Sequence, residues 1–123
     1  MRYALLMHHH EPADGELDAE VIAEAQRAFD VYAKALAQAG VLLSADVLQP
    51  TGSTTTVTRR DGTPRVQDGP FAETKEALAG IFLIDVPDLD AAIDWARQNP
   101  AAQWGSIEIR PVSTSFLDGG WTR

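Results

Sequence analysis

The sequence predicts a single α+β domain in which two amphipathic helices cover one face of an antiparallel sheet. Three observations lead to this prediction. Several short segments have strand length and apolar or alternating character, two segments have apolar residues at helical spacing, and 123 residues suit one hydrophobic core. Hydrophobic residues make up 45% of the chain and charged residues 23%, which is typical of a globular protein rather than a disordered or fibrous one.

Turn-forming residues divide the chain into eight expected elements. In chain order these are a strand over 2–8, a helix over 18–39, a strand over 41–48, two hairpin strands over 54–58 and 63–67, a strand over 77–86, a short helix between Pro87-Asp88 and Asn99-Pro100, and a strand over 106–112. We assign residues 1–113 to the domain and residues 114–123 to a polar C-terminal tail.

Each element rests on its own local pattern. The first strand places Ala4, Leu6 and His8 on one face. The long helix has acids in its first turns and Gly40 as its stop. Its apolar residues recur at helical spacing: Val21, Ala25, Ala28, Phe29, Tyr32 and Leu36. The polar, β-branched hairpin turns around residues 60–62. Strand, helix and strand on either side of this hairpin are the order of the split βαβ, ferredoxin-like fold with an inserted hairpin.

Two strands of this sheet are apolar on both faces, namely the segments Tyr3–Met7 and Ile81–Ile84. Two helices can cover only one face of such a sheet. We therefore expect a second copy of the chain on the other face, giving a homodimer that closes as a dimeric α+β barrel. The alternative is a monomer in which a long loop folds over the sheet.

Composition excludes several classes of function. A formal net charge of −8 argues against nucleic-acid binding, which needs clustered cations. Arg59, Arg60 and Arg65 lie close in sequence, but they flank a turn and suit a solvated hairpin tip. The apolar run before His8 is too short for a signal peptide or a membrane span. The absence of cysteine removes disulfides and thiol chemistry and suits a cytoplasmic location.

Residues 66–76 carry the most distinctive motif, Val-Gln-Asp-Gly-Pro-Phe-Ala-Glu-Thr-Lys-Glu. Within it, Asp68-Gly69-Pro70 predicts a sharp turn with a positive φ at Gly69. Phe71 is expected to anchor this turn on the core, and the charged residues Glu73, Lys75 and Glu76 to lie at the mouth of the sheet. From these residues alone, a well-built turn with solvated charges is favoured over a binding site.

The segment 66–76 and the elements around it resemble the DGPF-type branch of the YCII-related proteins. The resemblance covers nearly the whole chain, including residues 36–40, 48–50, 80–82 and 105–111. It implies a dimeric α+β barrel. It further implies either a His–Asp enzyme acting on small organic substrates, with dehydrochlorination of a hydroxylated aromatic as one activity, or an accessory to sigma-factor-like regulators. The family often has a histidine on the first helix at the position of Phe29, so a pair using that histidine is missing here.

The histidines His8, His9 and His10 end the first strand. If the strand persists, His8 and His10 share a face, and we expect His8 to lie nearer a pocket than His9. Three interpretations stay open at this point: exposed histidines at a strand end, a proton-transfer site, or a metal site made by His8, His10 and Glu11.

Our hypothesis is a small enzyme, using neither cofactor nor metal, that performs acid–base elimination or isomerisation on a small organic metabolite bound between the sheet and the dimer partner. The expected catalytic residues are His8, His10, Asp68 and Glu73. The expected substrate-binding residues are Phe71, Lys75, Phe82 and Glu108. The rival hypothesis is a non-catalytic small-molecule-binding or accessory module linked to a sigma-factor-type transcriptional regulator.

Overall fold

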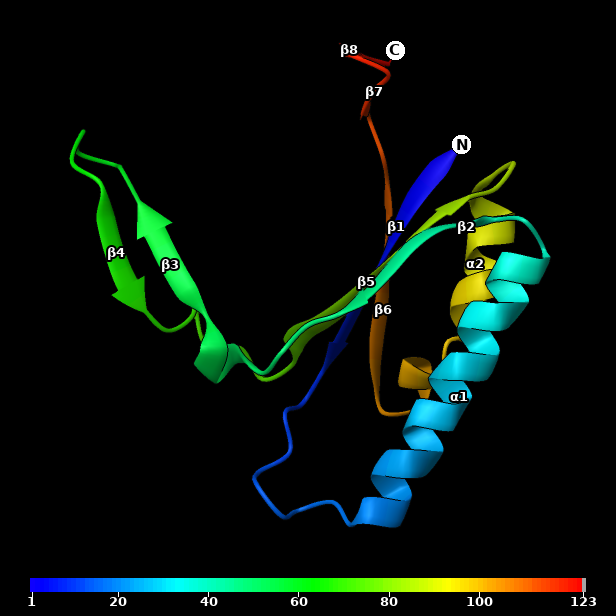
Figure 1. Ribbon diagram of the computed structural model, residues 1–123, viewed down its shortest axis with the longest axis horizontal. Coiled ribbons are helices and arrows are strands. Elements are labelled where there is room, and N and C mark those ends of the chain that lie inside the picture. Colours follow the sequence, from blue (N-terminus) through cyan, green and yellow to red (C-terminus); the bar gives the residue numbers. More distant parts are fainter. Residues whose placement is uncertain (123) are drawn as a thin grey trace.

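The computed structural model describes residues 1–122 of the chain (Figure 1). Its elements, in chain order, are β1 (Arg2–His9), α1 (Ala19–Gln38), β2 (Leu42–Val47), the 3-10 helix η1 (Thr51–Ser53), β3 (Thr55–Thr58), β4 (Arg65–Asp68), β5 (Ala77–Asp85), α2 (Leu89–Gln98), the 3-10 helix η2 (Pro100–Gln103), β6 (Gly105–Pro111), β7 (Phe116–Leu117) and β8 (Gly120–Trp121).

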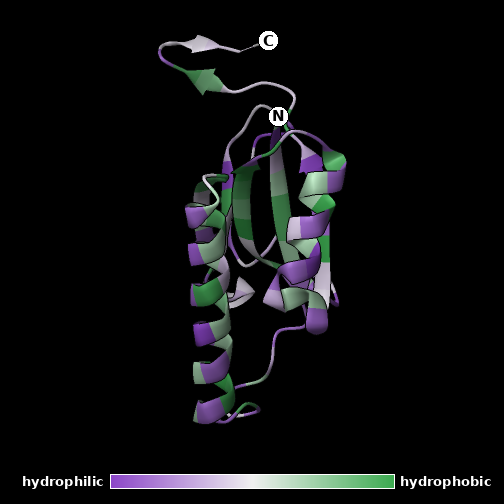
Figure 2. Cartoon of the chain, turned by 90° about the vertical axis from the view of Figure 1, so that its right-hand side faces the viewer, coloured by the Kyte–Doolittle hydropathy of each residue, from purple (hydrophilic) through white to green (hydrophobic). Residues whose placement is uncertain are grey.

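Four antiparallel strands form the main sheet, in the order β2-β5-β1-β6. Both helices lie on the same side of this sheet (Figure 2). Each helix begins at the acid that the sequence suggests, because the side chains of Asp18 and Asp88 accept backbone hydrogen bonds at the N-termini of α1 and α2. The order of elements and strands confirms the predicted α+β, ferredoxin-like arrangement of the chain, with β3 and β4 inserted between β2 and β5.

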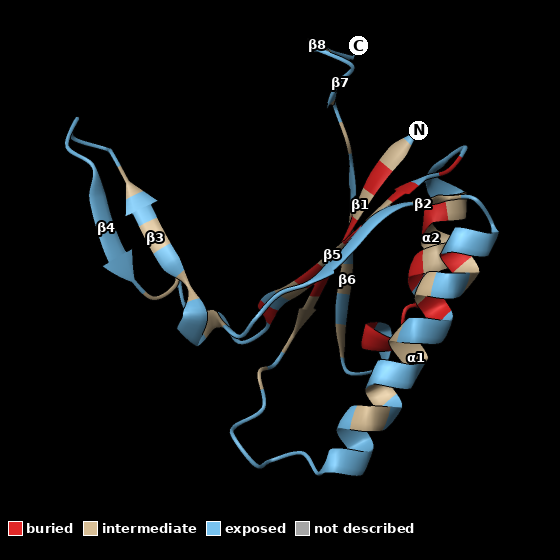
Figure 3. Cartoon of the chain, viewed as in Figure 1, coloured by how far each residue is buried: buried red, intermediate tan, exposed pale blue. Residues whose placement is uncertain are grey.

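The core lies between the main sheet and the two helices. Alternate residues of β1 and β5 point into it and meet apolar side chains of α1 and α2, so the buried residues appear as regular bands along the strands (Figure 3). Tyr32 of α1 packs edge-to-face on Phe82, with 5.3 Å between ring centroids. Its hydroxyl donates to the Trp95 carbonyl at 2.8 Å, and burial raises the pKa of Tyr32 to about 12.

The other face of the main sheet is its open face, because both helices of the described chain lie opposite it. The centre of the open face is apolar and half-buried, with Leu6 from β1 and Ile81 and Leu83 from β5. Its margin is polar, with Asp46 from β2 on one side and Glu108 from β6 on the other. The predicted two-faced character of the central strands is therefore present in the folded chain.

The β3–β4 hairpin projects from the body as a separate arm, defined here as residues 54–71 (Figure 1). Its strands pair only with each other, and Val57 lies opposite Val66 with both side chains exposed. The expected anchoring of Phe71 on the core is wrong. After the turn at Gly69 the chain folds back along the arm, and Phe71 is 70% exposed. The Cζ atom of Arg60 lies over the Phe71 ring, 5.3 Å from the ring centroid.

The expected polar tail contains a second small hairpin, formed by β7 and β8. Asp118 and Gly119 both have positive φ, as a tight two-residue hairpin turn requires, and Phe116 packs edge-to-face on Trp121. The local sequence signal for this hairpin is Asp118-Gly119 between two short apolar pairs. This signal is easily missed when only the polar composition of the whole tail is considered. Residue 123 lies outside the described residues.

The positive φ predicted at Gly69 is confirmed, with a value of 100°. A β-branched residue there should cost about 1–3 kcal/mol of backbone strain, which is comparable to the stability of an isolated hairpin. We therefore expect Gly69→Val to unfold the arm locally while the main sheet and both helices stay folded. Loss of the nuclear Overhauser contacts between Val57 and Val66 would report this local unfolding of the arm. The control is Gly52→Val, at a glycine without positive φ. Equal contacts in both variants would contradict this account.

Candidate functional site

The candidate site lies on the open face, at the end of the sheet where β1 finishes. Because Leu5 and Met7 are buried under the helices, alternation turns Leu6 and His8 toward the open face. In β6 the residues opposite them are Glu108 and Ser106 respectively. The diagonal contact brings His8 Nε2 to 3.1 Å from Glu108 Oε1, with the two side chains 28% and 53% exposed.

A second carboxylate joins this pair from the end of the signature segment. The Ser106 hydroxyl donates to Glu76 Oε1 at 3.0 Å, and Glu76 directly precedes β5. We call His8, Glu76, Ser106 and Glu108 the open-face group. It combines one imidazole, one hydroxyl and two carboxylates, which are the side chains that bind and move protons near neutral pH.

Two glycines allow the strands to approach closely at this end of the sheet. A Cβ at Gly105 would collide with the carbonyl oxygen of His8 and would lie 2.7 Å from the Cβ of His9. A Cβ at Gly80 would collide with the Met7 side chain and would lie 2.9 Å from the Asp46 carbonyl oxygen. Glycine at position 105 therefore allows the register of β1 and β6 that places Glu108 beside His8, and glycine at position 80 allows the close pairing of β2 with β5.

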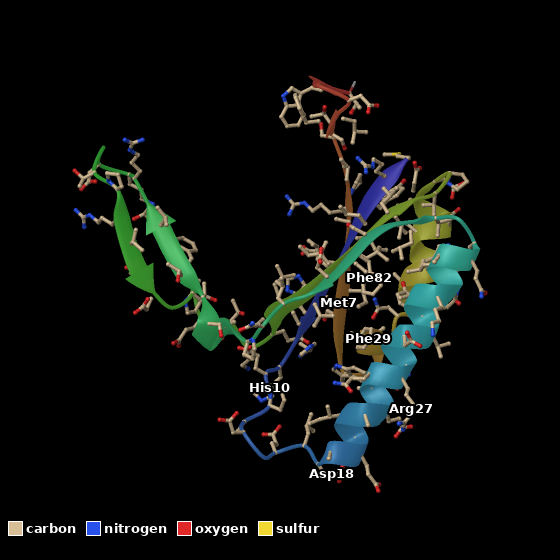
Figure 4. All side chains as sticks on the ribbon, in the orientation of Figure 1. Met7, His10, Asp18, Arg27, Phe29 and Phe82 are labelled. Carbon is tan, nitrogen blue, oxygen red and sulfur yellow. The ribbon has the colours of Figure 1, made fainter. Side chains whose placement is uncertain are left out.

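The other two histidines lie apart from the open-face group. His9 pairs with Gly105 of β6, and alternation directs its side chain to the face of β1 opposite that of His8. Its Nδ1 is 3.0 Å from the His10 carbonyl oxygen. His10 is exposed and follows the end of the strand (Figure 4). The strand thus ends before it could align His10 with His8. Among residues 1–122, no three His, Asp or Glu side chains are grouped so that they could hold a metal ion, and this includes the set hypothesised from His8, His10 and Glu11.

Glu11 is occupied elsewhere. Its carboxylate accepts hydrogen bonds from the Thr51 hydroxyl and, at 2.8 Å, from the Thr51 backbone amide. These two bonds, the hydroxyl first, lower the pKa of Glu11 below its ordinary range. They connect the loop that follows the histidines to η1, which is the base of the arm.

The remaining predicted site residues fall into two places. Asp68, Phe71, Glu73 and Lys75 lie on the arm or on the irregular segment that leads back from it, and all four are exposed. Phe82 lies on the helix-covered side of β5 and is 3% exposed, so it contributes to the core (Figure 4). In the described chain the carboxylate that contacts His8 is that of Glu108.

Phe29 occupies the place where the resemblance led us to expect a histidine. Figure 4 shows it on α1, on the side that faces the body of the domain. Its ring packs edge-to-face against Trp104, with 6.2 Å between centroids, so this position carries a packing contact. The imidazole of the open-face group comes from β1 instead.

The fold and the open-face group define a small ferredoxin-like α+β protein whose polar group lies on the uncovered face of its sheet. Comparison with known proteins agrees with this class. Residues 1–115 match the model of the YCII-related domain. An uncharacterized protein of Rhizobium meliloti (strain 1021) is 36% identical over 115 residues, which are 92% of this chain and 93% of that protein. The chain belongs to the YCII-related family.

Neither helix of residues 1–122 has the length and apolar character needed to cross a membrane.

The close approach at Gly105 leads to a prediction. Gly105→Ala should destabilise the fold by roughly 1–3 kcal/mol, because the added methyl group overpacks the junction between β1 and β6. Urea denaturation checks this value. The control is Gly120→Ala, where a Cβ would meet nothing within 4 Å. If the two variants unfold at the same urea concentration, the glycine is not required for this strand pairing.

The lowered pKa of Glu11 leads to a second prediction. The folded pKa lies below the unfolded one, so the contact with Thr51 stabilises the fold fully above the ordinary glutamate pKa of about 4.3 and is lost as pH falls through the folded value. The Thr51 amide resonance should therefore shift with acid in that range. Glu11→Gln should abolish the shift, whereas Glu16→Gln, at an exposed residue nearby, should preserve it. A pH-independent Thr51 resonance in the wild-type chain would contradict the contact.

Proposed function

We propose that this protein is a small homodimeric enzyme in which His8 serves as the general base on an organic metabolite bound against the open face. The observation that carries the proposal is the contact of 3.1 Å between His8 Nε2 and Glu108 Oε1. A carboxylate that accepts a hydrogen bond from one nitrogen of an imidazole fixes the orientation of the ring and leaves the other nitrogen free to face a substrate. This is the pairing of groups that proton transfer near neutral pH requires.

The proposal requires one particular tautomer of His8. An ionised Glu108 carboxylate can only accept a hydrogen bond, so Nε2 carries the proton in the neutral ring. Nδ1 then has the free lone pair and is the atom that takes a proton from the substrate. The electron pair left on the substrate either forms a double bond at a new position, with the proton returned to another carbon, or expels a leaving anion. These outcomes are isomerisation and elimination.

The surroundings of the open-face group support a small organic ligand. Leu6, Ile81 and Leu83 form an apolar floor beside the polar group, and they are only half-buried in the single chain. A second copy of the chain placed on the open face would exclude water from the floor and the polar group together. The carbon skeleton of the ligand would then contact the apolar floor, with its reacting proton at His8.

The test compares His8→Ala and Glu108→Gln with His10→Ala, using chloride release from a chlorinated hydroxyaromatic as the reaction. Loss of a general base lowers rates by about 10²–10⁴-fold, so His8→Ala should fall in that range. Glu108→Gln should fall less, because the ring keeps a hydrogen-bond acceptor. His10→Ala should stay close to the wild-type rate, since His10 lies outside the open-face group.

A spectroscopic measurement accompanies the rates. Nitrogen-15 shifts of the His8 ring should show the proton of the neutral form on Nε2 in the wild-type chain. A neutral ring protonated on Nδ1, or full activity in His8→Ala, would contradict the proposed mechanism. Binding of the compound by the wild-type chain without turnover would instead favour a non-catalytic small-molecule-binding module.

A further inference from the structure

The arm presents apolar side chains that no other element of residues 1–122 covers. It forms a two-stranded ribbon with four residues in each strand, and such a ribbon is at best marginally stable on its own. Val57 and Val66 form an exposed apolar pair on one side, with 64% and 69% of their surfaces accessible. The Phe71 ring lies beneath Arg60 and lines a hollow with residues 56–60, which include Val57 and Arg59. Both valines keep most of their surface accessible.

Charge distinguishes the arm from the rest of the chain. Residues 54–68 contain three arginines and two aspartates, so this segment has a formal charge of +1. The whole chain has a formal charge of −8, so the remaining residues together carry −9. Arg65 already contacts Asp61 at 2.7 Å within the arm, and Arg60 lies over Phe71. Arg59 follows β3 directly, two residues after Val57. A basic ribbon on an acidic protein is complementary to another copy of that protein.

The open face has the matching features. Its apolar floor of Leu6, Ile81 and Leu83 is uncovered, and two carboxylates, those of Glu76 and Glu108, lie at its edge. An arm strand with its turn, about five residues at roughly 3.3 Å each, reaches about 16 Å. Four strands at about 4.8 Å spacing give the sheet a width of about 14 Å between its outer strands. One arm is thus long enough to cross the open face of a neighbouring subunit.

We propose that the arm of each subunit lies across the open face of a second copy, with Val57 and Val66 on the part of the apolar floor that the ligand leaves free and Arg59 beside the partner's Glu76 and the partner's Glu108. This rests on the proposed function, because it treats the open face as the site. With Arg59 in place, a cation from the other subunit partly balances the two carboxylates of the open-face group. Each site is then incomplete without the arm of the other subunit.

The test uses the absence of cysteine from the sequence, which makes a single engineered cysteine a unique labelling position. A nitroxide is attached to Thr63→Cys at the arm tip, and this chain is mixed with nitrogen-15-labelled wild-type chain that carries no nitroxide. Any paramagnetic broadening of the labelled chain is then intermolecular. We expect the amide signals of His8, Ser106 and Glu108 to lose intensity. The matched control carries the nitroxide on Gln26→Cys, on α1 at the other side of the sheet, and should leave these signals unchanged.

A second pair of variants tests the role of Arg59. Arg59→Glu should weaken dimerisation about tenfold or more in sedimentation equilibrium, because it places a carboxylate beside the partner's Glu108. Arg97→Glu is the control, since Arg97 lies on α2 and its partner Asp94 is on the same helix. The control should leave the dimerisation constant within about twofold.

The outcomes separate the two proposals. A mass of twice 13.3 kDa together with broadening at His8, Ser106 and Glu108 supports the exchanged arm. The same mass without that broadening, or with unchanged dimerisation of Arg59→Glu, overturns the arm proposal and leaves the dimer standing. A monomeric mass at micromolar concentration overturns both the exchanged arm and the dimer. Loss of chloride release in His8→Ala without broadening retains the proposed base and removes only the arm.

Discussion

β1 is the central constraint of this molecule, because it is hydrogen-bonded to β5 on one edge and to β6 on the other. Its side chains alternate, so burial of Tyr3, Leu5 and Met7 under the helices determines the direction of every other residue. Burying each large apolar side chain contributes about 1.5–3 kcal/mol. A shift of the β1 register by one residue would remove these contributions and would turn the His8 side chain into the core. The register of the core is therefore also the register of the open-face group.

The residues that form the core and the most exposed apolar residues belong largely to different parts of the chain. Its core is confined to the space between the main sheet and the helices, while the arm and the β7–β8 hairpin keep their apolar side chains exposed. Three exposed side chains lie outside the core of the domain, namely those of Val57, Val66 and Trp121. Changes at such exposed positions should leave the folding of the body largely unaffected, and under the proposed exchange of arms those at Val57 and Val66 should act on association.

Much of the fold could be predicted from sequence because its signals are local. Alternation identified the faces of β1, the residues Asp18 and Gly40 marked the ends of α1, and the turn at Gly69 has the expected conformation. The open-face group could not be assembled in the same way. His8 and Glu108 are 100 residues apart, and their contact depends on the exact pairing of β1 with β6. No local pattern encodes that pairing, so the carboxylates expected beside the histidine were those nearest to the signature turn.

Phe71 and His10 show two other limits of sequence reasoning. An aromatic residue after a tight turn usually has a core to enter, but here the arm carries the turn away from the sheet and a guanidinium covers the ring. His10 would have shared a face with His8 had the strand continued by one residue. The chain instead leaves the strand at His9 toward Glu11, which hydrogen-bonds to Thr51. In both cases a contact from a distant part of the chain decided the outcome.

The place where the arm joins the body has a consequence for how this scaffold can vary. The chain leaves the sheet after β2 and returns to the adjacent strand β5, where the Leu48 amide donates to the Ala79 carbonyl oxygen at 2.8 Å. The two ends of the inserted segment are therefore held together whatever lies between them. Doubling the length of such a closed segment costs only about 0.6 kcal/mol in chain entropy. A peptide epitope or a small folded domain grafted at Asp61-Gly62 should therefore leave the main sheet intact, because the sheet does not depend on the length of the segment inserted between β2 and β5.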